Sequence, residues 1–280
     1  EKSEGFTGSI KDREVTKKLL EEENLGRSEE YRRKAVEEAR AEYLKNPTEM
    51  QVITKYSKAL VEMDDESSEN EAIDILKKAY ETTKIYRFKV TIGDVRIKQI
   101  NRNIRVLRDA MRSDPNDAQL KADYEQLQKE KLSVELTEYR ERAEHFPTDM
   151  VVRYEFGRRL YLSGMYDEAI GALQEAQNNP KHRIEALLLL GRSFMSQRML
   201  PEALDTLKRA IEDYELASTG DARSKDLHYW YGRALEENGN VTQAIDVYSQ
   251  IVRWDIGFMD ARKRLTALRD RVESQGEKSA

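Results

Sequence analysis

The feature that most constrains the fold of this chain is a pattern that occurs three times in its second half. Each copy has Gly, then Ala, then a bulky apolar residue, then Ala or Ile, at internal spacings of 12, 4 and 3 residues. The copies begin at Gly157, Gly191 and Gly232, so the second follows the first by 34 residues and the third follows the second by 41. A repeat of this length indicates structural units that bury their apolar faces only against one another.

Each copy is predicted to be a helix–turn–helix, because apolar residues recur at the helical period on both sides of a short turn such as Ser163-Gly164. A glycine inside a helix costs about 1 kcal/mol relative to alanine. We therefore expect the three glycines to gain close contact with a neighbouring helix. Of Gly191 and the loop residue Gly220, only Gly191 is expected to face such a neighbour. The matching small residues on the second helices are Ala169, Ala203 and Ala244.

The pattern resembles the tetratricopeptide repeat, which reads W-x2-L-G-x2-Y, then A-x3-F, then P, at a period of 34. Its first half matches residues 156–160, 190–194 and 231–235, and its second half matches residues 169–173, 203–207 and 244–248. None of the three copies has Trp at the first position of the family pattern. The Pro at the end of the pattern is present only as Pro180, one residue early. The resemblance covers residues 150 to about 256 and implies an array of helical hairpins.

The rest of the chain is divided by weaker patterns. Residues 1–27 form an N-terminal extension with little pattern, either mobile or docked along the array. Residues 28–83 are predicted to be a helix followed by a degenerate repeat, in which Ser57 takes the place of the glycine. Residues 147–256 hold the three repeats, and residues 257–280 are expected to form a capping helix and a C-terminal tail.

Residues 84–146 interrupt the repeats. Apolar residues from Tyr86 to Met111 alternate at steps of four and three, which is the seam of a coiled coil. Pro115 and its polar neighbours then signal a helix end and restart. We predict two long helices in an antiparallel hairpin; the alternative is a degenerate repeat over residues 117–146 that turns near Lys131–Ser133. The predicted fold class is thus an all-α, tetratricopeptide-like solenoid of helical hairpins, interrupted by a long antiparallel helical hairpin.

Composition excludes several classes of protein. Hydrophobic residues make up 39% of the chain, too many for a disordered protein, and charged residues make up 36%. The net charge of −5 gives no global attraction to nucleic acid or anionic lipid. The absence of Cys excludes disulfides but leaves the compartment open. No uncharged stretch approaches the roughly 18 residues of a membrane-spanning helix.

We predict no catalytic, cofactor-binding or metal-binding residues, and therefore no enzyme. The three His residues lack the spacing of a zinc-binding helix, and neither phosphate-binding loops nor nucleophile motifs occur. Because the chain has 53 carboxylates, chance pairs are certain and none can be nominated as an acid–base pair.

Basic residues cluster on the first helix of the predicted hairpin, where residues 84–113 carry nine basic and two acidic side chains. One interpretation is that they pair with acids on the neighbouring helix. The other is a phosphate-binding face, although it lacks the aromatic residues that stack on single-stranded bases. An acidic protein would fit the same face. Its candidate residues are Arg96, Lys98, Arg102, Arg105 and Arg112.

The resemblance also implies a binding groove. In tetratricopeptide arrays the first helix of each pair lines the concave face, and here an arginine directly follows each packing glycine: Arg158, Arg192 and Arg233. The residues four before and three after each arginine share its helix face; they are Tyr154, Leu188 and Tyr229, and Tyr161, Met195 and Glu236. This row suits an acidic or carboxylate-ended peptide with apolar anchors. Related arrays clamp C-terminal carboxylates with Lys and Asn, and the Asn places are not matched. The alternative is that each arginine only pairs with an acid such as Glu155 or Glu236.

The function expected from this resemblance is that of a non-enzymatic scaffold, which holds a peptide or helix of a partner protein in the groove. Two alternatives remain open from the sequence: a structural subunit that assembles with itself, and nucleic-acid binding through the basic helix, which the net charge disfavours. The sequence does not identify the partner or the oligomeric state.

Overall fold

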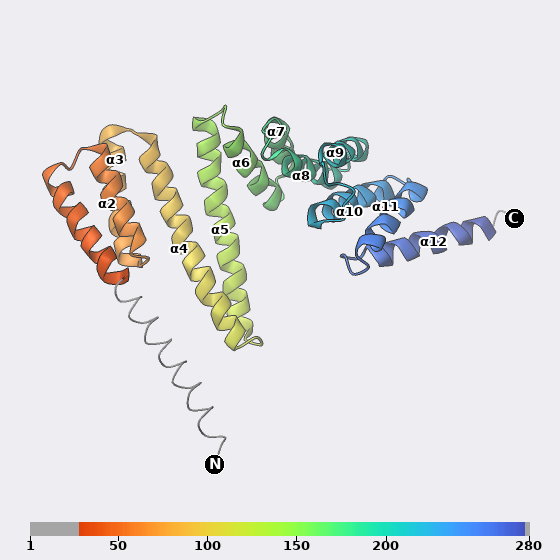
Figure 1. Cartoon of the computed structure of the whole chain (residues 1–280), viewed down its shortest axis with the longest axis horizontal. Helices are drawn as coiled ribbons and strands as arrows, with labels where there is room; N and C mark the ends of the chain where they lie inside the picture. The colour runs from red at the N-terminus through yellow and green to blue at the C-terminus, as the bar shows by residue number, and fades with distance from the viewer. Residues whose placement is uncertain (1–27, 278–280) are drawn as a thin grey trace, which may run out of the picture. The chain divides into compact units, whose positions relative to one another are not determined.

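The computed structural model describes residues 28–277, and all regular secondary structure in that range is helical (Figure 1), which confirms the all-α prediction. The N-terminal extension expected over residues 1–27 lies outside the described residues. A first helix covers residues 28–45. The helices that follow are α2 (Met50–Glu62), α3 (Glu66–Thr83), α4 (Tyr86–Ser113), α5 (Ala118–His145), α6 (Met150–Leu162), α7 (Tyr166–Ala176), α8 (Arg183–Ser196), α9 (Leu200–Asp213), α10 (Ala222–Glu237), α11 (Val241–Trp254) and α12 (Ala261–Glu277).

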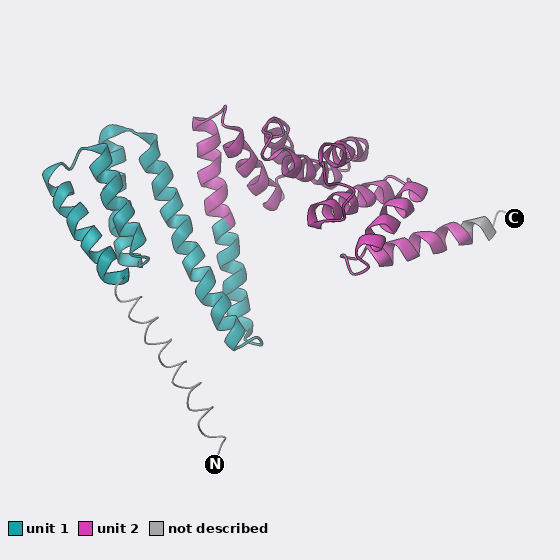
Figure 2. Cartoon of the chain, in the orientation of Figure 1, with its two compact units in different colours: residues 1–131 teal, residues 132–280 magenta. Residues whose placement is uncertain are grey.

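The chain divides into two compact units that meet within α5, between Lys131 and Leu132 (Figure 2). This boundary differs from those expected at residues 83 and 146. The reason is that the beginning of α4 belongs to the core of the first unit, through Phe88 and Ile92. The end of α5 belongs to the core of the second unit, through Ala143.

The predicted long helices are both present and continuous. α4 and α5 are 28 residues each, and the short segment Asp114–Asp117 joins them. Asp117 caps the start of α5, since its carboxylate accepts hydrogen bonds from the backbone N–H groups of Gln119 and Leu120 at 2.7 and 3.0 Å. The alternative of a turn near Lys131–Ser133 is wrong. That stretch has neither Gly nor Pro to end a helix.

In the first unit, α2 and α3 form a helical hairpin where the degenerate repeat was expected. Its core also contains the helix over residues 28–45 and the beginning of α4, and Ser57 is buried at the place of the repeat glycine. The core residues are Ala39, Ile53, Tyr56, Leu60, Ala72, Ile73, Ile75, Leu76, Ala79, Phe88, Ile92 and Val95.

A backbone feature links this hairpin to the three repeats of the second unit. In all four hairpins the residue seven after Ser57 or the repeat glycine has a left-handed backbone: Asp64 (φ 61°), Gly164 (φ 75°), Arg198 (φ 61°) and Gly239 (φ 83°). A left-handed residue just past a helix end satisfies the last carbonyls and reverses the chain. The same turn geometry therefore supports α2–α3 as a diverged copy of the repeat.

The second unit stacks the pairs α6–α7, α8–α9 and α10–α11, and α12 packs on the last pair. The predicted contacts of the repeat glycines are confirmed. A Cβ atom added to Gly157 would lie 2.8 Å from Cγ of Leu173, and one added to Gly191 would lie 2.5 Å from Cγ of Leu207. At Gly232 the nearest atom would be Cε1 of Tyr248, at 3.0 Å. Because each glycine has no Cβ atom, it leaves space for the bulky residue that lies 16 positions later, on the second helix of its pair.

The expectation that Gly220 faces no neighbouring helix is wrong. Its φ is +73°, and an added Cβ would lie 2.5 Å from Cγ of Trp254 on α11. The turn at Gly220, near the end of the seven extra residues, therefore lies against α11.

Candidate functional site

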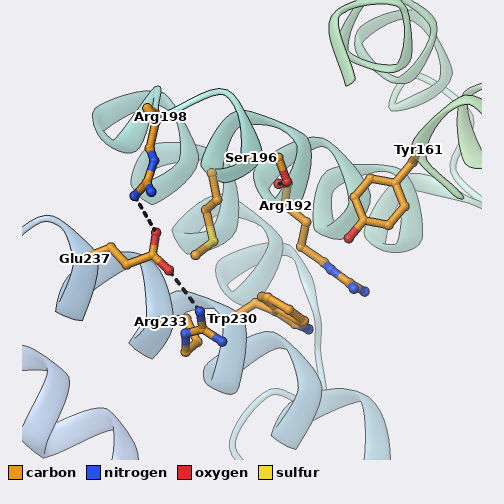
Figure 3. Close-up of a pocket in the computed structure, with 8 residues that line it drawn as sticks. Tyr161, Arg192, Ser196, Arg198, Trp230, Arg233 and Glu237 are labelled. Atoms are coloured by element: carbon orange, nitrogen blue, oxygen red, sulfur yellow. Dashed lines mark hydrogen bonds and ion pairs between the residues drawn. The ribbon is translucent and has the colours of Figure 1, made fainter. Parts of the chain in front are cut away.

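The second unit has a pocket of about 280 Å³ where α6, α8 and α10 and the turn after α8 face one another (Figure 3). It is lined by residues from all three repeats, and these include three arginines and two aromatic side chains. The lining residues are Tyr161, Arg192, Met195, Ser196, Arg198, Trp230, Arg233 and Glu237. Four of the nine predicted groove residues are thus brought together: Tyr161, Arg192, Met195 and Arg233.

Arg192 occupies the middle of the pocket between two aromatic rings. Its guanidinium carbon lies 4.9 Å from the ring centroid of Tyr161 and 4.0 Å from that of Trp230. Such cation–π contacts are worth about 0.5–1 kcal/mol each when exposed and more when desolvated. They restrict the guanidinium plane, so its N–H groups are held in a fixed direction. Among the described residues Arg192 has no ion pair, and its Nε–H has no hydrogen-bond acceptor.

Trp230 in the pocket lining is hydrogen bonded to Asp226, a partly buried carboxylate outside that lining. The indole Nε1–H of Trp230 donates to Asp226 at 3.1 Å. Burial raises the pKa of Asp226, while the positive charge of Arg192 and the indole hydrogen bond act in the opposite direction. Burial also raises the pKa of the Tyr161 hydroxyl. Asp226 therefore supports the ring against which Arg192 stacks.

The other two repeat arginines have acidic partners. Nη1 of Arg158 lies 3.8 Å from Glu155, as the alternative interpretation proposed. Nη2 of Arg233 lies 3.0 Å from Glu237, and Nη1 of Arg198 lies 3.9 Å from the same carboxylate. The acid that pairs with Arg233 is thus Glu237, not Glu236. Only Arg192 of the three repeat arginines lacks an acid within ion-pair distance among the described residues.

The remaining predicted groove residues do not line this pocket. Tyr154 is buried and its ring stacks on His182 at 4.5 Å between centroids. Leu188 is half-buried against the repeat core. Tyr229 is buried and donates its hydroxyl to Asp260 at 2.6 Å.

Glu236 holds helices together instead of facing the pocket. It accepts hydrogen bonds from the Tyr248 hydroxyl at 2.8 Å and from Arg264 at 2.9 Å. It therefore links α10 to both α11 and α12.

Four pocket residues were missed by the sequence reasoning: Ser196, Arg198, Trp230 and Glu237. Glu237 lies four residues after Arg233, a spacing at which helical ion pairs form, so a sequence signal existed. Arg198 had a different signal, since it occupies the turn position that holds glycine in the first and third repeats. Trp230 had none, because the corresponding residues are Glu155 and Leu189.

The predicted basic face of α4 is partly neutralised by acidic side chains of the first unit. Lys98 lies 2.9 Å from Asp64 and 3.2 Å from Glu69, and Arg102 lies 2.6 Å from Glu69. Arg105 is 4.0 Å from Asp64. Arg112 pairs with Asp109 on its own helix at 3.0 Å, and Arg96 is also engaged. A phosphate would have to displace these acids, so the structure does not favour nucleic-acid binding here.

The described residues 28–277 lack the features of two other kinds of site. No group of three or more His, Asp or Glu side chains there could hold a metal ion. No helix in that range has the length and apolar content needed to cross a bilayer.

Comparison with known proteins supports the repeat assignment. A family model of the tetratricopeptide repeat matches residues 154–218 and 188–256. The C-terminal part of a TPR repeat-containing protein from Cytophaga hutchinsonii is similar in structure, with a TM-score of 0.50 and 15% identity, over 84% of this chain and 95% of that one.

Two further solved structures are similar at 20% identity and a TM-score of 0.44. One is YrrB, described as a TPR protein with an unusual peptide-binding site, for which the match covers 60% of this chain and 84% of that chain. The other is MamA, with 56% and 95% covered. A search of curated proteins finds no sequence match.

The stacked hairpins with packing glycines define an α-helical repeat scaffold. The family match over residues 154–256 shows that this part of the chain consists of tetratricopeptide repeats. Proteins of this family are generally non-catalytic and bind other proteins, so the general function is that of a protein-interaction scaffold.

Proposed function

We propose that this chain is a non-enzymatic scaffold that binds an acidic segment of a partner protein in the pocket formed by α6, α8 and α10. A carboxylate of the partner would pair with Arg192, and apolar partner residues would cover Tyr161 and Met195. The repeats hold these side chains on rigid helices, so little ordering is needed when the segment binds.

The observation that carries the proposal is the position of Arg192. A guanidinium stacked between Tyr161 and Trp230 is restricted in direction, yet within the described residues it has no acidic partner. An arginine prepared in this way is suited to a bidentate hydrogen-bonded pair with a carboxylate.

The test is selection of a random linear peptide library on the full chain, followed by calorimetric measurement of the selected peptides. We expect the selected peptides to share an Asp or Glu and to lose at least tenfold in affinity for the Arg192→Glu variant. The matched control is Lys208→Glu, an exposed residue of α9 that undergoes the same change of charge. Selection without an acidic residue, or a loss of less than threefold in Arg192→Glu with the melting curve unchanged, would contradict the proposal.

A further inference from the structure

The pocket contains its own anion. The carboxylate of Glu237 lies 3.0 Å from Nη2 of Arg233 and 3.9 Å from Nη1 of Arg198, so one acid engages both of the other pocket arginines (Figure 3). The side chains of Glu237 and Arg233 are each about one quarter exposed, whereas Arg198 is 82% exposed. The Glu237–Arg233 pair is therefore the shielded and stronger of the two.

This arrangement divides the pocket into two electrostatic parts. On one side of Trp230, Arg192 has no acid within ion-pair distance among the described residues. On the other side, Arg233 lies 5.8 Å from the same ring and its charge is compensated by Glu237. A single ligand carboxylate can satisfy Arg192 alone. A dianionic group needs additional cations, and the nearest ones are already engaged by a negative side chain that would repel it.

We propose that Glu237 is a specificity-determining residue, which restricts the pocket to ligands with one carboxylate, such as a Glu or Asp side chain, and disfavours phosphorylated side chains. The inference rests on the proposed function, because it assigns the ligand class of the same site. Removing the charge of Glu237 frees Arg233 and Arg198 and converts the pocket into a three-arginine site, to which a phosphate group is well matched.

The experiment uses two matched probes, N-acetyl-leucyl-glutamyl amide and N-acetyl-leucyl-phosphoseryl amide. Binding to the full chain is followed by NMR at constant ionic strength and pH 7.5, where the phosphoseryl group is predominantly dianionic. The reporter is the indole N–H of Trp230, and the chain's second tryptophan, Trp254, lies outside the pocket lining and serves as an internal reference. The variants are Glu237→Gln, Arg192→Ala and the control Glu212→Gln, which removes one exposed acid from α9.

We expect Glu237→Gln to raise the affinity for the phosphoseryl probe at least fivefold more than that for the glutamyl probe. Glu212→Gln should leave the ratio of the two affinities within twofold of wild type. If Glu237→Gln also leaves that ratio within twofold while Arg192→Ala abolishes binding of the glutamyl probe, the inference about Glu237 is wrong and the proposed function stands. If Arg192→Ala leaves glutamyl binding unchanged, or no variant shifts the Trp230 signal, both are wrong.

Discussion

At the scale of single residues, close packing against a neighbouring helix explains why the repeat positions hold glycine. A Cβ atom added to Gly191 would lie 2.5 Å from Cγ of Leu207, an atom that moves away only if the Leu207 side chain changes its χ1 rotamer or the backbone shifts. Gly171 on α7 has nothing within 4 Å of an added Cβ. An added Cβ atom would therefore clash at Gly191 but not at Gly171, although the two glycines lie in neighbouring helices of the same unit.

The expected outcome is that Gly191→Ala lowers the free energy of unfolding by about 1–3 kcal/mol, the usual penalty for overpacking. Gly171→Ala should raise it by up to about 1 kcal/mol, because alanine is the better helix former. Urea unfolding followed by circular dichroism measures both. Equal effects of the two substitutions would contradict the packing role of Gly191.

Arg198 has a left-handed backbone conformation that residues other than glycine rarely adopt. It takes the left-handed turn position that Gly164 and Gly239 occupy in the neighbouring repeats. A side chain in this conformation costs about 1 kcal/mol relative to glycine. The same turn places the Arg198 guanidinium in the pocket lining, near Glu237.

We therefore expect Arg198→Gly to raise the free energy of unfolding by about 1 kcal/mol, as measured in urea. Arg198→Ala removes the same side chain but keeps the strained backbone, so it should give no such increase. A similar gain in both variants would show that the arginine side chain, and not its backbone conformation, is the destabilising feature.

At the scale of elements, α4 is attached to the first hairpin by a buried charge as well as by its apolar face. Glu69 of α3 is fully buried, and Arg102 and Lys98 of α4 contact its two carboxylate oxygens at 2.6 and 3.2 Å. A buried carboxylate without its partner is strongly unfavourable. This cluster also engages the charges of Lys98 and Arg102, two of the basic residues of α4.

Arg102→Ala should lower the free energy of unfolding of the first unit by about 3 kcal/mol, because it removes one partner of a buried ion pair. Arg105→Ala, on the same helix, should change it by less than about 0.5 kcal/mol, since that side chain is exposed and its ion pair is long. Thermal unfolding of the full chain with both variants provides the comparison. Indistinguishable melting curves for the two variants would mean that Glu69 contributes little to the attachment of α4.

At the scale of the whole molecule, the end of α5 is part of the second unit's core. Ala143 is buried there, and Arg159 of α6 lies 3.2 Å from Glu135 and 3.8 Å above the ring of Tyr139. α5 thus covers the first repeat helix, which would otherwise expose its apolar side.

A fragment of residues 132–280 is therefore expected to unfold cooperatively and at a melting temperature several degrees above that of a fragment of residues 147–280. A difference of 1 kcal/mol corresponds to about 2–8 °C for domains of this size range. Calorimetry of the two fragments measures it. Equal melting temperatures would indicate that the repeats are stable without α5.

The repeat units follow from local patterns, each of which lies within the short stretch of sequence that forms one hairpin. The positions of Gly157, Gly191 and Gly232, and the bulky residue 16 places after each, predict helical hairpins that pack closely. Likewise, the stretch without Gly or Pro predicts the continuous helix α5. These features depend on contacts between neighbours along a helix or within one hairpin, which is why sequence reasoning reached them.

The pocket depends instead on how successive hairpins stack. Tyr161, Arg192 and Trp230 belong to three different repeats, and no sequence spacing predicts that one guanidinium will lie between the two rings. The positions of Glu236 and Glu237 show the same dependence: a shift of one residue rotates a helical side chain by about 100°, so Glu237 lines the pocket while Glu236 bonds to α11 and α12. Helical periodicity sets which residues share a face, but only the packing of one repeat on the next decides what that face meets.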